Sequence, residues 1–461
     1  MKKDLLADLR AGKELSRRQQ FLLTARLSLP PILAHLSSVV MQYIDAAMVG
    51  RLGAGDAASV GLVASTTWLF LGLTEAINIG FVVLVAQHIG AGEEQEARKV
   101  MKQGLLTALF LSALLAVIGA AISVPLPHWL KAEEALCPAA GRYFLIYALS
   151  VPLIQMNSMA AGMLQASGNM RTPGIGMVTM CALDVIFNAI LIFPTRKVKN
   201  FTLYGFGWGV TGAALGTLLA QAVIGAVLLY CLLRRSQMLH LRKEEHFRYA
   251  VPLLRQSGKI ALPIALERII MCMAQIVSTA IVAPLGTIAI AAHSFSITAE
   301  SLCYMPGYGF QNAATTMVGQ SYGAKRYDMA YRLGWLAVLL GMLVMAGTGV
   351  FLYAAAPWML GILSPDKEVV ALGAEMLRIE AFAEPFFAAS IVAFGVFQGM
   401  GHTLIPTVLN FASMWGIRIP LSVFLVPELG LRGVWIAMCA ELIARGIIFL
   451  VYMRDRETRK K

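Results

Sequence analysis

The chain alternates between long runs of hydrophobic residues and short polar connections. Each run is long enough to cross a bilayer as an α-helix, which needs about 20 apolar residues to span roughly 30 Å of hydrocarbon. The pattern predicts twelve transmembrane helices, over residues 21–49, 57–88, 100–125, 139–167, 173–194, 207–233, 257–285, 287–319, 332–363, 372–399, 403–426 and 430–453. We therefore expect an all-α membrane protein.

Composition agrees with this expectation. Of the 461 residues, 58% are hydrophobic and 14% are charged, a balance that a soluble fold of this length would struggle to keep in solution. Residues 1–20 are charged, and the apolar run after them is too long and has no small-residue cleavage site. The first helix is therefore expected to act as its own insertion signal. The cysteines show no C-x-x-C spacing, so we expect no metal cluster built on them and no cofactor.

Basic residues collect in three segments, residues 1–20, residues 234–258 and the tail 454–461. The loops that would face the opposite side are poor in Lys and Arg apart from a cluster at 196–199. Because cytoplasmic loops carry the excess of positive charge, both termini are expected in the cytoplasm of a bacterial inner membrane. The net charge of +12 follows from this bias, and no basic face alternates with aromatic residues, so nucleic acid is not expected as a partner.

An internal repeat with an offset of 233 residues runs through most of the chain. It pairs VGRLG at 49–53 with VAPLG at 282–286, and LQASGNMRTP at 164–173 with FQGMGHTLIP at 397–406. An even number of helices in each copy makes the copies parallel, related by an axis along the membrane normal. Such halves enclose a central cavity and rock around a site near the midplane.

The repeat divides the chain into five parts. We predict a cytoplasmic N-terminal segment at 1–20, an N-lobe bundle of six helices at 21–233, a cytoplasmic linker at 234–258, a C-lobe bundle of six helices at 259–453 and a basic cytoplasmic tail at 454–461.

The repeated segments and several others resemble the multidrug and toxic compound extrusion (MATE) transporters over essentially the whole chain. The matching segments are YIDAAMVGRLG at 43–53, GAGEEQEAR at 90–98, QASGNMRTP at 165–173, APLGTIAIAAHSFS at 283–296, FQGMGHT at 397–403 and WGIRIPL at 415–421. The resemblance implies two six-helix bundles, an outward-facing V-shaped cleft, and export of cationic or amphipathic drugs in exchange for H⁺ or Na⁺. The expected partners are thus small-molecule drugs or metabolites and membrane lipids, and we expect a monomer.

The same resemblance places the family's N-lobe cation site on Asp45, Asp184, Asn188 and Thr217. Within this pattern the chain departs from the usual order in the fifth helix, where an Asn normally precedes an Asp by four residues. In the C-lobe, the positions at which some family members carry acidic residues are Met271 and Phe387 here.

The residues themselves support a coupling site. Asp45 lies in an otherwise uncharged run, and a carboxylate at membrane depth costs roughly 2.5–3.5 kcal/mol unless it is neutralised, solvated or paired. Asp184 and Asn188 share one helix face. Two carboxylates close together in a low-dielectric setting either share a proton or hold a monovalent cation such as Na⁺ between them. The alternatives are a helix-end aspartate for Asp45 and an interhelical hydrogen-bonded pair for the other two.

Other polar residues at membrane depth allow more than one interpretation. Glu75 and Asn78 either line the substrate cavity, help the N-lobe site or pair structurally. Glu267 and Glu300 either attract cationic substrates in the cavity or form structural pairs with Arg268 or Arg378.

Prolines at paired positions of the repeat add a possible source of motion. Pro30, Pro152, Pro263 and Pro385 all lie inside predicted helices. A proline removes one backbone hydrogen bond, so Pro30 is a candidate hinge for the first helix, with static packing as the alternative.

The sequence disfavours three other functions. A lipid-linked precursor flippase shares the two-lobed architecture but needs a strongly basic cavity, and the intramembrane charges here are mostly acidic. A membrane enzyme is disfavoured because the chain has no H-E-x-x-H cluster, no phosphate-binding glycine loop and no pairing of a nucleophile with a base. A channel fits the duplicated parallel halves less well than alternating access does.

Overall fold

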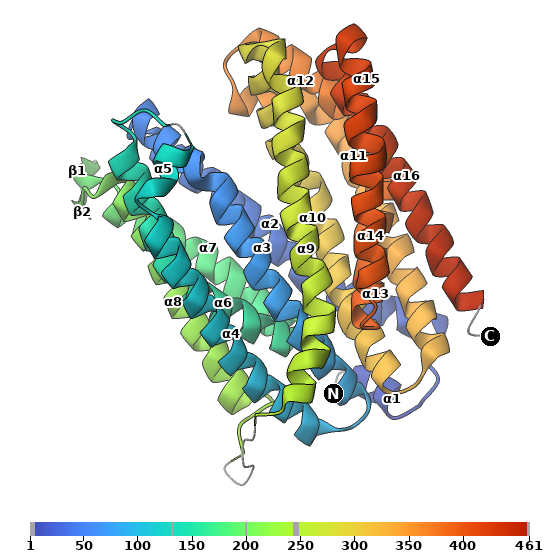
Figure 1. Ribbon diagram of the computed structural model, residues 1–461. Helices are drawn as coiled ribbons and strands as arrows, with labels where there is room; N and C mark the ends of the chain where they lie inside the picture. The colour runs from blue at the N-terminus through green and yellow to red at the C-terminus, as the bar shows by residue number, and fades with distance from the viewer. Residues whose placement is uncertain (1–4, 131, 199–200, 243–248, 459–461) are drawn as a thin grey trace. The chain divides into compact units, whose positions relative to one another are not determined.

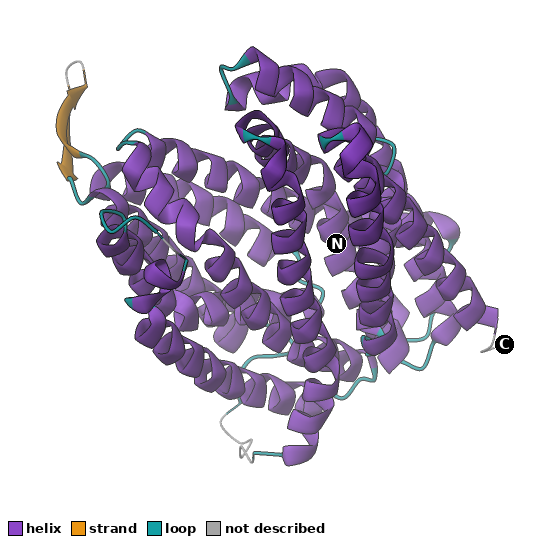
Figure 2. Ribbon diagram, turned by 45° about the horizontal axis from the view of Figure 1, so that its top comes forward, coloured by secondary structure: helices purple, strands orange, loops and turns teal. Residues whose placement is uncertain are grey.

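The computed structural model describes residues 5–130, 132–198, 201–242 and 249–458, and these are almost entirely helical (Figures 1 and 2). Up to the middle of the chain the helices are α1 (Leu5–Arg10), α2 (Arg17–Gly50), α3 (Ala54–Gly90), α4 (Glu94–Ile122), α5 (Pro125–Trp129), α6 (Cys137–Ala166), α7 (Arg171–Leu191) and α8 (Gly209–Tyr230), which continues as the π-helical turn η1 (Cys231–Arg235). The remainder are α9 (Val251–Val282), η2 (Ala283–Leu285), α10 (Thr287–Gly323), α11 (Tyr327–Leu363), α12 (Lys367–Glu380), α13 (Glu384–Gly399), α14 (Leu404–Ser413), η3 (Met414–Arg418), α15 (Ile419–Leu429) and α16 (Leu431–Thr458).

The predicted fold class is confirmed. Ten of the described helices are long and apolar enough to cross a membrane, and the bent pair of α12 and α13 would form an eleventh span. The 37-residue helix α10 coincides with the predicted run at 287–319. Each of the twelve predicted runs therefore coincides with a helix or with a helix interrupted by a short irregularity.

The run predicted as one helix at 372–399 is broken in the structure. α12 and α13 meet at an angle of 59°. Pro385 lies in the first turn of α13, where its missing N–H costs nothing, and a helix continuing from α12 would have needed that donor. Pro385 therefore lies in a helix as expected, but in its first turn, whereas Pro30, Pro152 and Pro263 lie in helix interiors.

A hairpin that the sequence did not predict connects α7 to α8. Its strands β1 (Pro194–Val198) and β2 (Phe201–Phe206) pair antiparallel, with Pro194 opposite Phe206 (Figure 2). The sequence predicts only a connection between two hydrophobic helices here. Two short strands contain too few residues to show the alternation of apolar and polar positions that would indicate a hairpin.

The chain forms two compact units. The N-unit consists of Ser37–Ile89 and Glu93–Ala261, and the C-unit of Met1–Leu36, Gly90–Gly92 and Leu262–Lys461. In the N-unit, α6 packs against α4 and α8, and α7 packs against α8. In the C-unit, α10 packs against α11 and α13, and α13 packs against α16, around a core that includes the fully buried Trp435.

Two helices belong partly to each unit. The first half of α2 packs in the C-unit, where a Cβ on Gly309 of α10 would meet the backbone of Ile32 and where Asn312 lies 3.1 Å from His35. Conversely, α9 begins at Val251, inside the predicted linker, and its first turns pack in the N-unit. Residues 243–248 of that linker lie outside the described residues.

Candidate functional site

Three helices of the N-unit bring the predicted cation-site residues together. Asp45 lies near the end of α2, Asp184 and Asn188 lie one turn apart on α7, and Thr217 lies on α8. Asp184 and Asn188 are fully buried. The two α7 side chains share a face because residues four apart in an α-helix are neighbours on its surface.

One amide bridges the two carboxyl groups. Asn188 Nδ2 donates to Asp45 Oδ1 at 2.8 Å and to Asp184 Oδ2 at 3.0 Å. The carboxyl groups of Asp45 and Asp184 also interact electrostatically with each other. Two carboxylates this close in a buried site cannot both stay charged at low cost.

Two buried oxygen atoms at this cluster have no hydrogen-bond donor among the described residues. They are Asp184 Oδ1 and Asn188 Oδ1. Gly216 of α8 makes the close approach possible, because a Cβ at that position would overlap Asn188 Oδ1. The hydroxyl of Thr217 donates to the carbonyl of Ala213 at 3.2 Å and also interacts with Asp184. Buried acceptors without donors favour a bound proton or cation.

The ligand set suits a monovalent cation. Two carboxyl groups, an amide and a hydroxyl offer oxygen atoms only, which are the donors that hard ions such as Na⁺ prefer. Among the described residues, no group of three or more His, Cys, Asp or Glu side chains could hold a metal ion. The cluster therefore has the donor set for Na⁺ or for a shared proton.

Glu75 and Asn78 of α3 lie elsewhere in the N-unit. Asn78 Nδ2 donates to the backbone carbonyl of Ser158 on α6 at 3.1 Å, which ties the two helices together. Glu75 is half-buried on the preceding turn. Neither residue lines the cavity described next.

A cavity of about 210 Å³ lies inside the C-unit. Glu267 and Glu300, both predicted as cavity residues, line it. Three arginines line it as well, namely Arg268, Arg418 and Arg445. Its remaining walls are mostly aromatic and apolar, with Tyr304, Tyr308, Phe387, Phe394 and Met271 among them.

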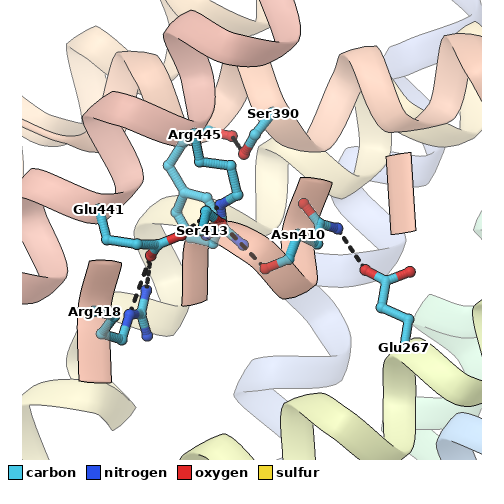
Figure 3. A network of polar contacts seen from close by, with 8 residues as sticks. Glu267, Ser390, Asn410, Ser413, Arg418, Glu441 and Arg445 are labelled. Carbon is cyan, nitrogen blue, oxygen red and sulfur yellow. Dashed lines mark hydrogen bonds and ion pairs between the residues drawn. The ribbon is translucent and has the colours of Figure 1, made fainter. Parts of the chain in front are cut away.

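Beside this cavity, one buried carboxylate contacts two arginines (Figure 3). Glu441 Oε2 accepts from Arg418 Nε at 3.1 Å and from Arg418 Nη2 at 2.7 Å, while Glu441 Oε1 lies 3.3 Å from Arg445 Nε. The side chain of Glu441 is fully buried and that of Arg445 is 5% exposed. The guanidinium of Arg445 also lies 5.5 Å from the ring centroid of Phe387.

The prediction that Glu267 and Glu300 pair with Arg268 or Arg378 was only partly right. Arg378 is exposed and lies over the ring of Tyr353, so it forms no pair with Glu267 or Glu300. Glu267 accepts from Asn410 Nδ2 at 2.5 Å and from the Thr407 hydroxyl at 3.5 Å, and it interacts electrostatically with Arg268. Exposure explains the difference for Arg378, because its guanidinium lies at the surface of the C-unit while Glu267 and Glu300 are buried.

Two further glutamates are buried in the C-unit, Glu380 and Glu384. Glu300 of α10 interacts electrostatically with Glu380 and Glu384, which flank the break between α12 and α13. All four carboxyl oxygens of Glu380 and Glu384 are buried, and none has a hydrogen-bond donor among the described residues.

Comparison with known proteins identifies the family. The MatE family matches residues 30–190 and 263–424, which together make up more than half of the chain and correspond to the two copies of the repeat. The chain belongs to the MATE family of transporters. The expected resemblance is thereby confirmed.

Relatives cover nearly the whole of this MATE chain. A probable multidrug resistance protein NorM of Thermotoga maritima is 25% identical over 446 residues, covering 95% of this chain and 92% of that protein. An uncharacterized transporter, YisQ of Bacillus subtilis, is 23% identical over 416 residues, covering 89% of each chain. The solved outward-facing conformation of a multidrug resistance MATE family transporter matches with a TM-score of 0.90 at 20% identity, covering 100% of this chain and 99% of that one, and so shows the same fold.

These matches narrow the alternatives. The named relatives are transporters, and the flippase alternative draws no support from them or from the family.

Several residues at these sites were not predicted from the sequence of the MATE chain. Three of them form the ion-pair network, namely Arg418, Glu441 and Arg445. The fourth is Tyr143 of α6, which interacts electrostatically with Asp45 and Asp184. Charges inside the runs 403–426 and 430–453 were the available signal for the first three.

Proposed function

We propose that the protein is a secondary active antiporter that exports small organic compounds, cationic or amphipathic, in exchange for H⁺ or Na⁺ by alternating access. The observation that carries the proposal is the pair of carboxyl groups, Asp45 and Asp184, bridged by the single amide of Asn188. Such a pair changes its net charge whenever a cation arrives or leaves, because two carboxylates in contact cannot both stay charged at low cost.

The position of Asp45 supports a link between cation binding and movement. It lies in the part of α2 that belongs to the N-unit, while the first half of the same helix packs in the C-unit. A cation that draws Asp45 toward Asp184 acts on one end of this shared helix. Pro30, in the other half, lacks a backbone N–H and is the proposed hinge. Asp184, Asn188 and Thr217 complete the coupling site.

The C-unit cavity is the proposed place for substrate. Glu267 and Glu300 supply attraction for basic groups, and the aromatic and apolar walls supply most of the contact. Asn78 has a packing role in this account, and Glu75 is kept as a residue that assists the N-unit site.

Location and orientation complete the proposal. Long apolar helices and family membership make this a multi-pass membrane protein. We infer that it acts as a monomer in a bacterial inner membrane. Both termini are proposed to lie in the cytoplasm, because basic residues concentrate at both ends and in 234–258. A reporter fused after Lys461 should be active only in its cytoplasmic form, and activity in a periplasmic form would refute the orientation.

The test of the function is transport by purified protein in proteoliposomes, with proton and sodium gradients imposed separately. The proposal predicts that ethidium moves against its own gradient under at least one of the two. Transport under neither gradient, by protein that is folded and correctly inserted, would refute the antiport. In a pump-deficient bacterium, expression should raise resistance to such dyes.

A further inference from the structure

The cavity in the C-unit carries more positive than negative groups on its walls. Three guanidinium groups line it against two carboxyl groups, those of Glu267 and Glu300. Glu441, which does not line the cavity, already contacts two of the three guanidiniums, Arg418 and Arg445. A guanidinium has five N–H donors, so one carboxylate leaves most of the donors of two arginines unused.

Arg445 is the group with the most donors to spare. Its side chain is 5% exposed, its Nε faces Glu441 at 3.3 Å, and its guanidinium lies over Phe387. No hydrogen bond to a described residue reaches either of its terminal nitrogen atoms. Because Arg445 lines the cavity, these nitrogens are available to a ligand there. The buried Nε of Arg445 also has no hydrogen-bond partner among the described residues. Buried charged donors without acceptors are costly, and a ligand oxygen bound to this guanidinium would relieve part of that cost.

The chemistry of the acceptor follows from the donors. A guanidinium presents parallel N–H groups that match the two oxygens of a carboxylate. The ring of Phe387 below Arg445, with Tyr304 at 5.4 Å from it edge to face, adds an aromatic wall next to the charged one. The volume of about 210 Å³ lies below the range of roughly 300–1,000 Å³ that drug-sized ligands occupy, so the ligand that the cavity accepts in this conformation is small.

We propose that the C-unit cavity binds a small aromatic carboxylate, with the carboxylate held by Arg445 and Arg418 and the ring placed against Phe387 and Tyr304. This inference rests on the proposed function, of which it specifies a substrate class. A ligand that also carries a basic group has Glu267 or Glu300 within the same cavity, so zwitterions belong to the class.

Equilibrium binding to protein in lipid nanodiscs, without any gradient, tests the inference. The probes are naphthoate, its neutral amide naphthamide and the cation naphthylmethylammonium. Naphthoate should bind, and naphthamide should bind about ten- to a hundredfold more weakly, because it loses charge-assisted hydrogen bonds. Equal binding of naphthoate and naphthamide, or no binding of naphthoate at millimolar concentration, would overturn the inference.

Variants locate the binding group. Arg445→Gln should weaken naphthoate binding about ten- to a hundredfold and should still fold, because Glu441 keeps Arg418 as its partner. Arg445→Lys keeps the charge but loses the planar guanidinium. Its affinity for naphthoate should therefore lie between those of Arg445→Gln and the wild type. The matched control is Arg378→Gln, since Arg378 also lies over an aromatic ring, at 5.7 Å from Tyr353, but is exposed and outside the cavity.

The outcomes separate this inference from the antiport. Wild-type affinity in Arg445→Gln would refute the carboxylate site and leave gradient-driven export of other compounds untouched. An Asp45→Asn variant that binds naphthoate normally but does not pump supports both proposals at once. If Arg445→Gln does not fold, Arg445→Lys and the comparison of naphthoate with naphthamide on the wild type decide the matter.

Discussion

Both units bury acidic side chains, but the two groups are arranged differently. In the N-unit, Asp45 and Asp184 face each other and an amide, with no arginine or lysine contact among the described residues. In the C-unit, Glu441 contacts two arginines, and Glu267 has Asn410 as a donor and Arg268 nearby. Only Glu380 and Glu384, at the break between α12 and α13, resemble the N-unit pair in having no donor among the described residues. Carboxyl groups that lack a fixed positive partner can exchange a mobile one, whereas carboxyl groups with arginine partners hold helices together.

The largest effect is expected from changes in Asp45 and Asp184, the pair of carboxyl groups without a positively charged partner. Asp184→Asn should reduce gradient-driven efflux to background, because one remaining carboxyl group can no longer alternate between a shared and a released cation. The fold should survive, since the change removes a costly buried charge. Dye efflux from cells, normalised to the amount of protein in the membrane, measures this. Efflux at the wild-type rate would show that Asp184 has no part in coupling.

Changing Glu441, which contacts two arginines, should lower the stability of the protein. Glu441→Gln leaves two buried guanidiniums without a carboxylate in contact, and breaking a buried ion pair from one side costs about 3–5 kcal/mol. Unfolding of the detergent-solubilised protein measures the loss. The matched control is Glu375→Gln, because Glu375 and Arg432 form an ion pair of 2.7 Å at the surface and such pairs contribute about 0–1 kcal/mol. Equal losses in the two variants would remove the distinction.

A smaller effect should follow from crowding the N-unit cluster. Gly216→Ala places a Cβ where Asn188 Oδ1 lies, so the amide must move away from the carboxyl groups. Losing one charge-assisted hydrogen bond corresponds to about a tenfold slower efflux. Gly347→Ala is the control, since a Cβ at Gly347 meets no atom within 4 Å. Unchanged efflux in Gly216→Ala would mean that the position of Asn188 is not critical.

The smallest effect concerns the helix that both units share. Pro30→Ala restores the possibility of a backbone hydrogen bond inside α2, so it should slow export modestly while leaving the cation site intact. Pro357→Ala in α11 is the matched control, because Pro357 also lies inside a helix. A similar change in both variants would indicate a general effect of proline on packing rather than a hinge in α2.

The two regions also differ in how far the sequence predicted them. The helices followed from runs of apolar residues, because length and hydrophobicity are local properties of a membrane-spanning segment. Asp45, Asp184 and Asn188 were visible as polar residues in such runs, and family resemblance added Thr217. Arg445 follows Glu441 by four residues, so that pairing could have been predicted from spacing alone. The contact with Arg418 was not visible, because Arg418 lies 23 residues away on another segment and no spacing rule connects them. The break before α13 was missed although Pro385 marks it, since Pro152 at the equivalent position lies within a continuous helix.

We propose that Asp45 and Asp184 couple the export of substrate to a cation. The most direct test compares wild type with Asp45→Asn in proteoliposomes, following dye movement while a proton or a sodium gradient is imposed. We expect wild-type protein to move dye against its gradient under at least one of the two imposed gradients, and Asp45→Asn, reconstituted at equal density, to move none. Pumping by Asp45→Asn at the wild-type rate would contradict the account and would place coupling elsewhere, with Glu75 and Glu267 as the leading candidates.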